Sequence, residues 1–264
     1  MAHLFIFGLG YSAKRIRTAA EALGWQVRGT GQDGETDFDD DAAVRAALGT
    51  ATHVLSSVPP EAEGDPVLRR YGEALSHTWL GYLSSTGVYG DTAGAWVDES
   101  APIRGRRAER AAADGEWLAR GARVFRLPGI YGPGRSALER VREGRAARID
   151  MAGQVFSRIH VDDLASGVIA GLAAPAAAYN LADELPASQN AVIEEACRMI
   201  GMTLPPLQAL DEAGLSQAAR AFYGENRRVA NGKARRVLGW QPRFATYREG
   251  LWAILRQTWL SKRG

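Results

Sequence analysis

The sequence predicts an α/β fold in which a doubly wound parallel sheet is joined to a smaller, mostly helical C-terminal lobe. Two observations predict it. Short apolar runs alternate with helical patterns along the first two thirds of the chain, as in sheets built from βαβ units. The last third carries a proline break and two helical patterns, which indicates a separate helical layer.

The first 27 residues carry the clearest pattern. The apolar run 3–7 leads into the turn GLGYSA at 8–13, and a helical stretch follows. A turn of this kind leaves unpaired N–H groups and the positive end of a helix dipole at one place, which suits a pyrophosphate. Gly8 permits the sharp turn, Gly10 lets backbone approach phosphate, and Ala13 lets the helix pack on the strand. This Rossmann-type unit predicts a dinucleotide site at Gly8, Gly10, Tyr11, Ser12 and Ala13.

The second apolar run, 25–30, decides which dinucleotide is favoured. A carboxylate at its end would bind the ribose hydroxyls of NAD and reject the 2′-phosphate of NADP. The run ends instead in GTGQ at 29–32. We therefore expect NADP or NAD, with a slight preference for NADP. The expected phosphate contacts are Thr30, Gln32 and Lys14 or Arg15, and Asp37 is expected at the adenine edge.

Hydroxyl side chains gather at the ends of two further predicted strands, 52–58 and 79–86. Ligands of an open parallel sheet lie beyond the carboxyl ends of its strands, so Ser56 and Ser57 are expected along the cofactor. Ser85 in the second run is a candidate for binding or catalysis. Capping of loop backbone is the alternative role for such hydroxyls.

The remaining elements complete the predicted order. They are a helix within 102–120, a strand from 124 that breaks at a glycine–proline loop, a helix opened by Asp162 or Asp163, a strand at 178–181, and helices at 190–200 and 246–260. We divide the chain into a dinucleotide-binding domain, 1–182, and a small lobe on the substrate side, 183–264. Residues 130–154 are expected to contribute to the second lobe.

Composition excludes several classes of function. A net charge of +2 over 264 residues gives no reason to expect nucleic acid as a partner, and no apolar run is long enough to span a membrane. The single cysteine, Cys197, excludes an internal disulfide and lies in an apolar helical pattern typical of a buried side chain. We expect a soluble cytoplasmic protein with a small-molecule substrate and no metal site. A homodimer is left open.

Six strings in order resemble the extended short-chain dehydrogenases/reductases of the NAD-dependent epimerase/dehydratase type. They are GLGYSA at 8–13, SSTGVYG at 84–90, RLPGIYGPG at 126–134, SRIHVDDLA at 157–165, YNLAD at 179–183 and NGKARRVLGWQP at 231–242. The resemblance implies a lobe for NAD or NADP and a second lobe for a substrate, often a nucleotide-sugar. It implies Ser85 as the catalytic hydroxyl on the reacting oxygen and Pro128 beside the nicotinamide. His160 and Asp162 match a motif that links the two lobes.

The chain departs from this family where the family keeps its Tyr-x-x-x-Lys pair, which works from one face of a helix. Alignment puts Arg106 and Arg110 at the two positions. The two arginines are four residues apart, so both are expected on one face of that helix. Arginine does not exchange its proton at neutral pH, so the pair either binds anionic groups of cofactor or substrate or lies on solvent as surface charge. Tyr89, Tyr131 or a water would replace the tyrosine. Thr86, Arg106 and Tyr131 are the expected contacts of the substrate.

Three hypotheses of function stay open at this point. The chain is an oxidoreductase, epimerase or dehydratase acting on a small or nucleotide-sugar-like substrate, a dinucleotide-binding sensor or regulator without turnover, or a structural protein that has lost the cofactor. The intact glycine turn opposes the third hypothesis, and the missing tyrosine–lysine pair weighs against the first.

Overall fold

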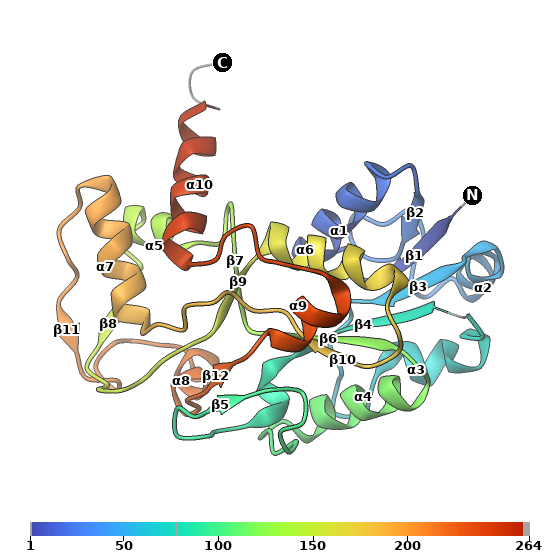
Figure 1. The fold of residues 1–264 in the computed structure, drawn as a ribbon, viewed down its shortest axis with the longest axis horizontal. Helices are drawn as coiled ribbons and strands as arrows, with labels where there is room; N and C mark the ends of the chain where they lie inside the picture. Colours follow the sequence, from blue (N-terminus) through green and yellow to red (C-terminus); the bar gives the residue numbers. More distant parts are fainter. Residues whose placement is uncertain (1, 78, 261–264) are drawn as a thin grey trace.

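The structure is a computed structural model that describes residues 2–77 and 79–260. Its centre is a six-stranded sheet with the order β10-β6-β4-β3-β1-β2, and every neighbouring pair is parallel (Figure 1). The strands are β1 (His3–Phe7), β2 (Gln26–Gly29), β3 (His53–Ser56), β4 (Trp79–Ser85), β6 (Arg123–Leu127) and β10 (Ala178–Asn180). The strand order reverses at β1, which confirms the doubly wound fold predicted from the sequence.

Helices cover both faces of this sheet, as Figure 1 shows. One face carries α1 (Tyr11–Glu21), α6 (Val161–Ala170) and α9 (Gly232–Leu238), and the other carries α2 (Asp41–Thr50), α3 (Pro66–Tyr71) and α4 (Ala108–Ala119). Successive side chains of β1 point alternately to the two faces of the sheet and so pack into both cores. Leu4 and Ile6 belong to the core under α1, whereas Phe5 and Phe7 belong to the core under α2 to α4.

The second lobe has a core of its own, in which Leu138, Ile193 and Ile254 are buried. Its helices are α5 (Ala137–Arg142), α7 (Gln189–Ile200), α8 (Gln217–Tyr223) and α10 (Tyr247–Leu260), and its short strands are β7 (Gly129–Tyr131), β8 (Arg148–Ile149), β9 (Arg158–His160) and β11 (Leu207–Gln208). Cys197 on α7 is buried, as the sequence predicts. None of the described helices is long and apolar enough to cross a bilayer.

The two lobes are tied together at the start of α6. The carboxylate of Asp163 accepts the backbone N–H groups of Arg243 and Phe244, at 2.7 and 3.0 Å. His160 caps α6 by accepting from the backbone N–H of Asp162, and its ring lies 4.4 Å from that of Phe244, centre to centre. The link expected from the motif at 157–165 is therefore present, with Asp163 as its main hydrogen-bond acceptor.

The chain after 228 returns to the first lobe. The strand β12 (Arg228–Val229) pairs with β5 (Trp96–Val97). Beyond it, Ala234 and Trp240 are buried in the core under α1 and α6. From the sequence, the chain is divided at residue 182. In space, part of the chain beyond that position packs into the first lobe.

A buried network of polar side chains joins α4 to the sheet. Arg126 on β6 donates to both carboxylate oxygens of Asp114 on α4, at 2.6 and 3.0 Å, and also to the hydroxyl of Tyr89 at 3.0 Å. Ser84 donates to the same carboxylate, and Tyr89 donates to Asn180 on β10, both at 2.7 Å. The side chains of Arg126 and Asp114 are 4% and 1% exposed, so each charge depends on the other.

We therefore expect Asp114→Asn to lower the free energy of unfolding by about 3 kcal/mol or more, because it leaves the Arg126 charge buried without a counter-charge. Urea unfolding followed by circular dichroism measures the change. The control is Glu184→Gln, which removes one partner of the half-exposed Arg235–Glu184 pair and should change the stability far less. Equal effects of the two variants would contradict the assigned role of the buried pair.

Candidate functional site

A cavity of about 690 Å³ lies beyond the carboxyl ends of β1, β3, β4 and β6. Both lobes line it. The glycine turn contributes Gly10, Tyr11 and Ser12, the strand ends contribute Ser57, Ser85 and Pro128, and the second lobe contributes Phe222, Glu225 and Arg227. The cavity therefore joins the predicted dinucleotide turn to the predicted catalytic hydroxyl.

The glycine turn has the geometry that a close phosphate needs. Gly8 has a φ of +84°, and a Cβ there would lie 3.1 Å from Val58, so only glycine fits without strain. Gly10 caps α1, and a Cβ there would meet nothing within 4 Å. The first intrahelical bond runs from Lys14 N–H to Gly10 C=O, so the N–H groups of residues 11–13 precede it and are free of helical partners.

Thr30 is hydrogen-bonded to the glycine turn and is buried, so it does not face a phosphate. It is 1% exposed, its hydroxyl accepts the N–H of Gly8 at 3.2 Å, and its carbonyl accepts the N–H of Leu9 at 2.7 Å. The prediction of a phosphate contact at Thr30 is therefore wrong, because the hydroxyl is enclosed between the first two strands. Gln32 and Asp37 are exposed and lie outside the cavity lining, and Asp37 accepts the N–H of Asp39.

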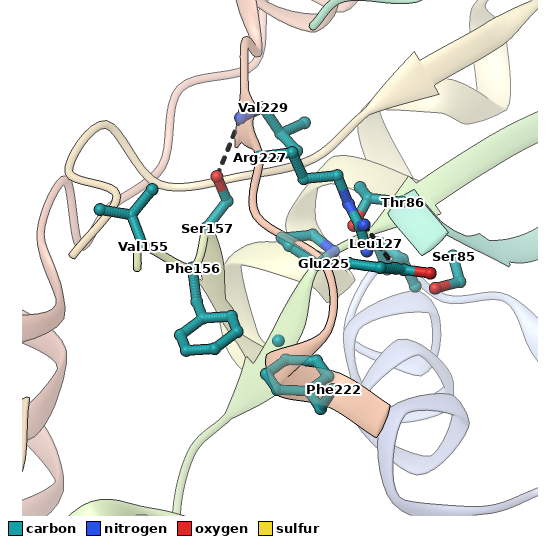
Figure 2. A pocket seen from close by; sticks show the side chains of 12 residues that line it. Ser85, Thr86, Leu127, Val155, Phe156, Ser157, Phe222, Glu225, Arg227 and Val229 are labelled. Carbon is teal, nitrogen blue, oxygen red and sulfur yellow. Dashed lines mark hydrogen bonds and ion pairs between the residues drawn. The ribbon is translucent and has the colours of Figure 1, made fainter. Parts of the chain in front are cut away.

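Ser85 lies where the cavity meets a smaller recess of about 90 Å³. Its hydroxyl oxygen accepts the N–H of Gly87 at 3.1 Å, which leaves the hydroxyl hydrogen available to a ligand. Thr86, labelled in Figure 2, lines the same recess, and so does Pro128. The structure thus brings Ser85, Thr86 and Pro128 together, next to Ser57 at the end of β3. Ser56 is fully buried and does not line the cavity.

Five arginines line the cavity, namely Arg106, Arg107, Arg110, Arg135 and Arg227. Arg110 lies in the first turn of α4, and its guanidinium makes no hydrogen bond or ion pair with another described residue. Burial lowers its pKa and the neighbouring Arg107 lowers it further, and these two effects outweigh the opposite effects of Tyr82 and Glu109. An anionic ligand would relieve that cost.

Arg106 does not share a helix face with Arg110, and that prediction is wrong. The helix α4 begins at Ala108, because the N–H groups of Arg104 and Gly105 bond the carbonyl of Val88 and hold the preceding residues in a loop. From this loop Arg106 still reaches the cavity. It pairs there with Glu225, with 2.7 Å between Nε and Oε1, and donates to the carbonyl of Ala221.

Neither candidate tyrosine faces the main cavity. Tyr89 is 1% exposed and its hydroxyl belongs to the network of Arg126 and Asn180, so the prediction that it replaces the missing tyrosine is wrong. Tyr131 lines a separate cavity of about 400 Å³, and its ring lies against Gly250 of α10. Burial raises the pKa of both tyrosines, so both are protonated at neutral pH.

Sequence reasoning missed three residues that line both the cavity and the recess, namely Phe222, Glu225 and Arg227. Phe222 stacks on Phe156, with ring centres 4.6 Å apart. The Glu225 carboxylate pairs with Arg106 and also with Arg227, at 2.6 Å. Burial raises the pKa of Glu225, but hydrogen bonds from Arg227 and Arg106 outweigh it and hold the pKa below its ordinary value. The sequence could have indicated these residues only through a motif known to place 222–227 beside the end of β4, where Ser85 lies.

The sheet, the glycine turn and the cavity at the strand ends define a Rossmann-type protein of two lobes. A solved structure of a functionally unknown conserved protein from Silicibacter pomeroyi DSS is 38% identical to the chain, with a TM-score of 0.87, covering 97% of this chain and 99% of that one. The fold is the one found in NAD-dependent epimerase/dehydratases and related short-chain dehydrogenases/reductases. This confirms the fold that the resemblance of the six strings implies.

More distant structures share the fold. A dTDP-glucose 4,6-dehydratase from Bacillus anthracis, solved in complex with NAD, is 15% identical at a TM-score of 0.76, covering 99% of this chain and 97% of that one. A UDP-glucose 4-epimerase from Thermus thermophilus, also solved with NAD, is 18% identical at a TM-score of 0.73, covering 96% and 99%. No family model matches the chain, and no curated protein matches it.

The two glycines of the turn should respond differently to substitution. Gly8→Ala forces a side chain into the left-handed region and against Val58, so we expect a loss of about 1 kcal/mol or more of stability. Gly10→Ala meets open space at a negative φ and should leave the stability nearly unchanged. Thermal and urea unfolding of both variants measure this. A Gly10→Ala variant as unstable as Gly8→Ala would contradict the geometry described for the turn.

Proposed function

We propose that the protein binds NADP or NAD along the glycine turn and uses it as an oxidoreductase, epimerase or dehydratase on a small, anionic or nucleotide-sugar-like substrate. The observation that carries the proposal is that one cavity joins Gly10, Ser85 and Pro128 to a group of arginines. The open space at Gly10 and the unpaired N–H groups that follow it fit a pyrophosphate. The bound nicotinamide would supply hydride transfer.

The chain's own residues would bind and orient the substrate. Ser85 has a hydroxyl hydrogen to donate to the reacting oxygen, since its oxygen already accepts from Gly87. Arg110 in the cavity lining offers an unpaired guanidinium to an anionic group of the substrate. Proton transfer would pass through a water, because the described residues that line the cavity include no lysine or histidine, and the hydroxyl of Tyr11 donates to the carbonyl of Pro133.

That same lining supports a second candidate function, a dinucleotide-binding sensor or regulator without turnover. The two functions differ in one observable. An enzyme oxidises or reduces its nicotinamide in the presence of an alcohol or carbonyl substrate, whereas a sensor binds the dinucleotide and leaves it unchanged. A panel of hydroxy acids, sugars and nucleotide-sugars, followed by nicotinamide absorbance, separates the two.

We expect Gly10→Val to weaken dinucleotide binding at least about tenfold, because its side chain enters the space that the pyrophosphate needs and removes more than one hydrogen bond. Calorimetric titration with NADP and NAD measures the affinity. Gly115→Val is the matched control, since a Cβ at Gly115 also meets open space and Gly115 lies outside the cavity lining. Undiminished affinity in Gly10→Val would contradict the proposal that the glycine turn binds the pyrophosphate.

We further propose that NADP is preferred slightly over NAD, and Glu35 supports this. Its carboxylate accepts the N–H of Gly29 at 3.3 Å and pairs with Arg17. Since the N–H of Thr30 bonds β1, the N–H of Gly29 points to the free edge of the sheet. The Glu35 carboxylate is thus bound at the edge of the sheet. The residues that follow the end of β2 are Gly31 and Gln32, neither of which carries a negative charge that would repel a 2′-phosphate. Lys14, half-exposed, is paired with Asp33, the residue after Gln32.

Titration should therefore give a lower dissociation constant for NADP than for NAD, and Lys14→Ala should narrow the difference by weakening NADP alone. Arg69→Ala, which removes a cation with the same kind of exposed ion pair on α3, is the control. Tighter binding of NAD in the unaltered protein would overturn the preference.

A further inference from the structure

We propose that Arg106 and Arg227 form a recognition site for a carboxylate group of the substrate, and that Glu225 occupies this site until the substrate replaces it. The identity of the ligand as a substrate rests on the proposed function. The site itself rests on the contacts of three side chains, and it is open to test without any dinucleotide.

The contacts of Glu225 are those that a bound carboxylate would make. Arg106 Nε donates to one of its oxygens at 2.7 Å, and an Arg227 terminal nitrogen donates to the other at 2.6 Å. Each oxygen thus has its own guanidinium, and the two guanidiniums come from different lobes. A planar anion with two oxygens matches this arrangement.

The carboxylate lies where a substrate would have to bind. Glu225 lines both the main cavity and the inner recess, together with Ser85 and Pro128. Figure 2 shows the side chain of Glu225 extending toward the end of β4, where Ser85 lies. A substrate carboxylate in its place would set a neighbouring alcohol or carbonyl carbon close to the Ser85 hydroxyl. The substrate class indicated by this position is a hydroxy acid, an oxo acid or a sugar acid.

The charge of the cavity explains why the free protein would keep an acid there. Among the described residues that line the cavity and the recess, Glu225 is the single acid against five arginines. Two of these arginines, Arg110 and Arg135, have no ion pair with a described residue. A cavity with this excess of positive charge attracts anions, and an internal carboxylate offsets part of that charge until one arrives.

The framework around Glu225 stays in place when its side chain rotates away. The backbone carbonyl of Glu225 accepts from Gln154 at 2.8 Å, and Arg227 also donates to the carbonyl of Gly90 at 2.8 Å. The N–H of Val229 is held by the hydroxyl of Ser157 at 2.9 Å. Exchange of one carboxylate for another therefore needs a rotation of the Glu225 side chain and no movement of the backbone that carries Arg227.

The test is a calorimetric titration of the full chain with propionate and with the neutral propionamide, in the absence of dinucleotide. Glu225→Gln keeps the shape of the side chain and removes its charge, so we expect propionate to bind about tenfold more tightly or better than to the unaltered protein. Propionamide should gain nothing. The gain should disappear when Arg106→Ala is added. The control is Glu184→Gln, which removes a carboxylate from an arginine pair outside the cavity and should leave propionate binding unchanged.

Three results would overturn the proposal: no gain for propionate in Glu225→Gln, a gain that survives Arg106→Ala, or an equal gain for inorganic phosphate. Should Glu225→Gln fail to fold, Glu225→Asp keeps the charge and withdraws the carboxylate by one methylene. It should give a smaller gain of the same sign, and its failure to do so would equally count against the site. Intact dinucleotide binding beside a failed propionate titration would refute this site and leave the proposed function standing.

Discussion

The structure depends most on the buried ion pair between Arg126 and Asp114. A guanidinium removed from water needs a counter-charge, and here that counter-charge comes from the helix that borders the cavity. The pair fixes α4 against β4 and β6, and thereby places Arg110 on the cavity wall. Because Ser84 is engaged with the same carboxylate, the strand is held so that Ser85, its neighbour, points the other way, into the cavity.

Charge is distributed in the cavity in two different ways. Arg106 and Arg227 hold a carboxylate of the chain itself, whereas Arg110 and Arg135 make no ion pair with a described acid. The alignment drawn from the sequence sets Arg110 at the lysine position of the family and Arg106 at the tyrosine position. Among the described residues that line the cavity, Tyr11 is the single tyrosine, and its hydroxyl donates to the carbonyl of Pro133, whereas Tyr89 and Tyr131 lie outside this lining.

Local pattern predicted the sheet, the glycine turn and the hydroxyls at the strand ends, because each depends on residues adjacent in sequence. The predictions that were wrong concern side chains whose positions depend on partners distant in sequence. Arg106 leaves the helix because of backbone bonds to Val88, and Tyr89 turns inward because its partners Arg126 and Asn180 lie on other strands. Glu225 and Arg227 reach the cavity only because β12 pairs with β5, a contact that no periodicity predicts.

The return of the chain to the first lobe has a consequence for how the molecule folds. Ala234 and Trp240 fill the core beneath α1 and α6, and the indole of Trp240 donates to Ser166 on α6. The first lobe therefore completes its interior with residues that follow those of the second lobe in the chain. Its core is unfinished until these residues dock, so the two lobes constitute one cooperative folding unit instead of two modules that could be separated by a cut between them.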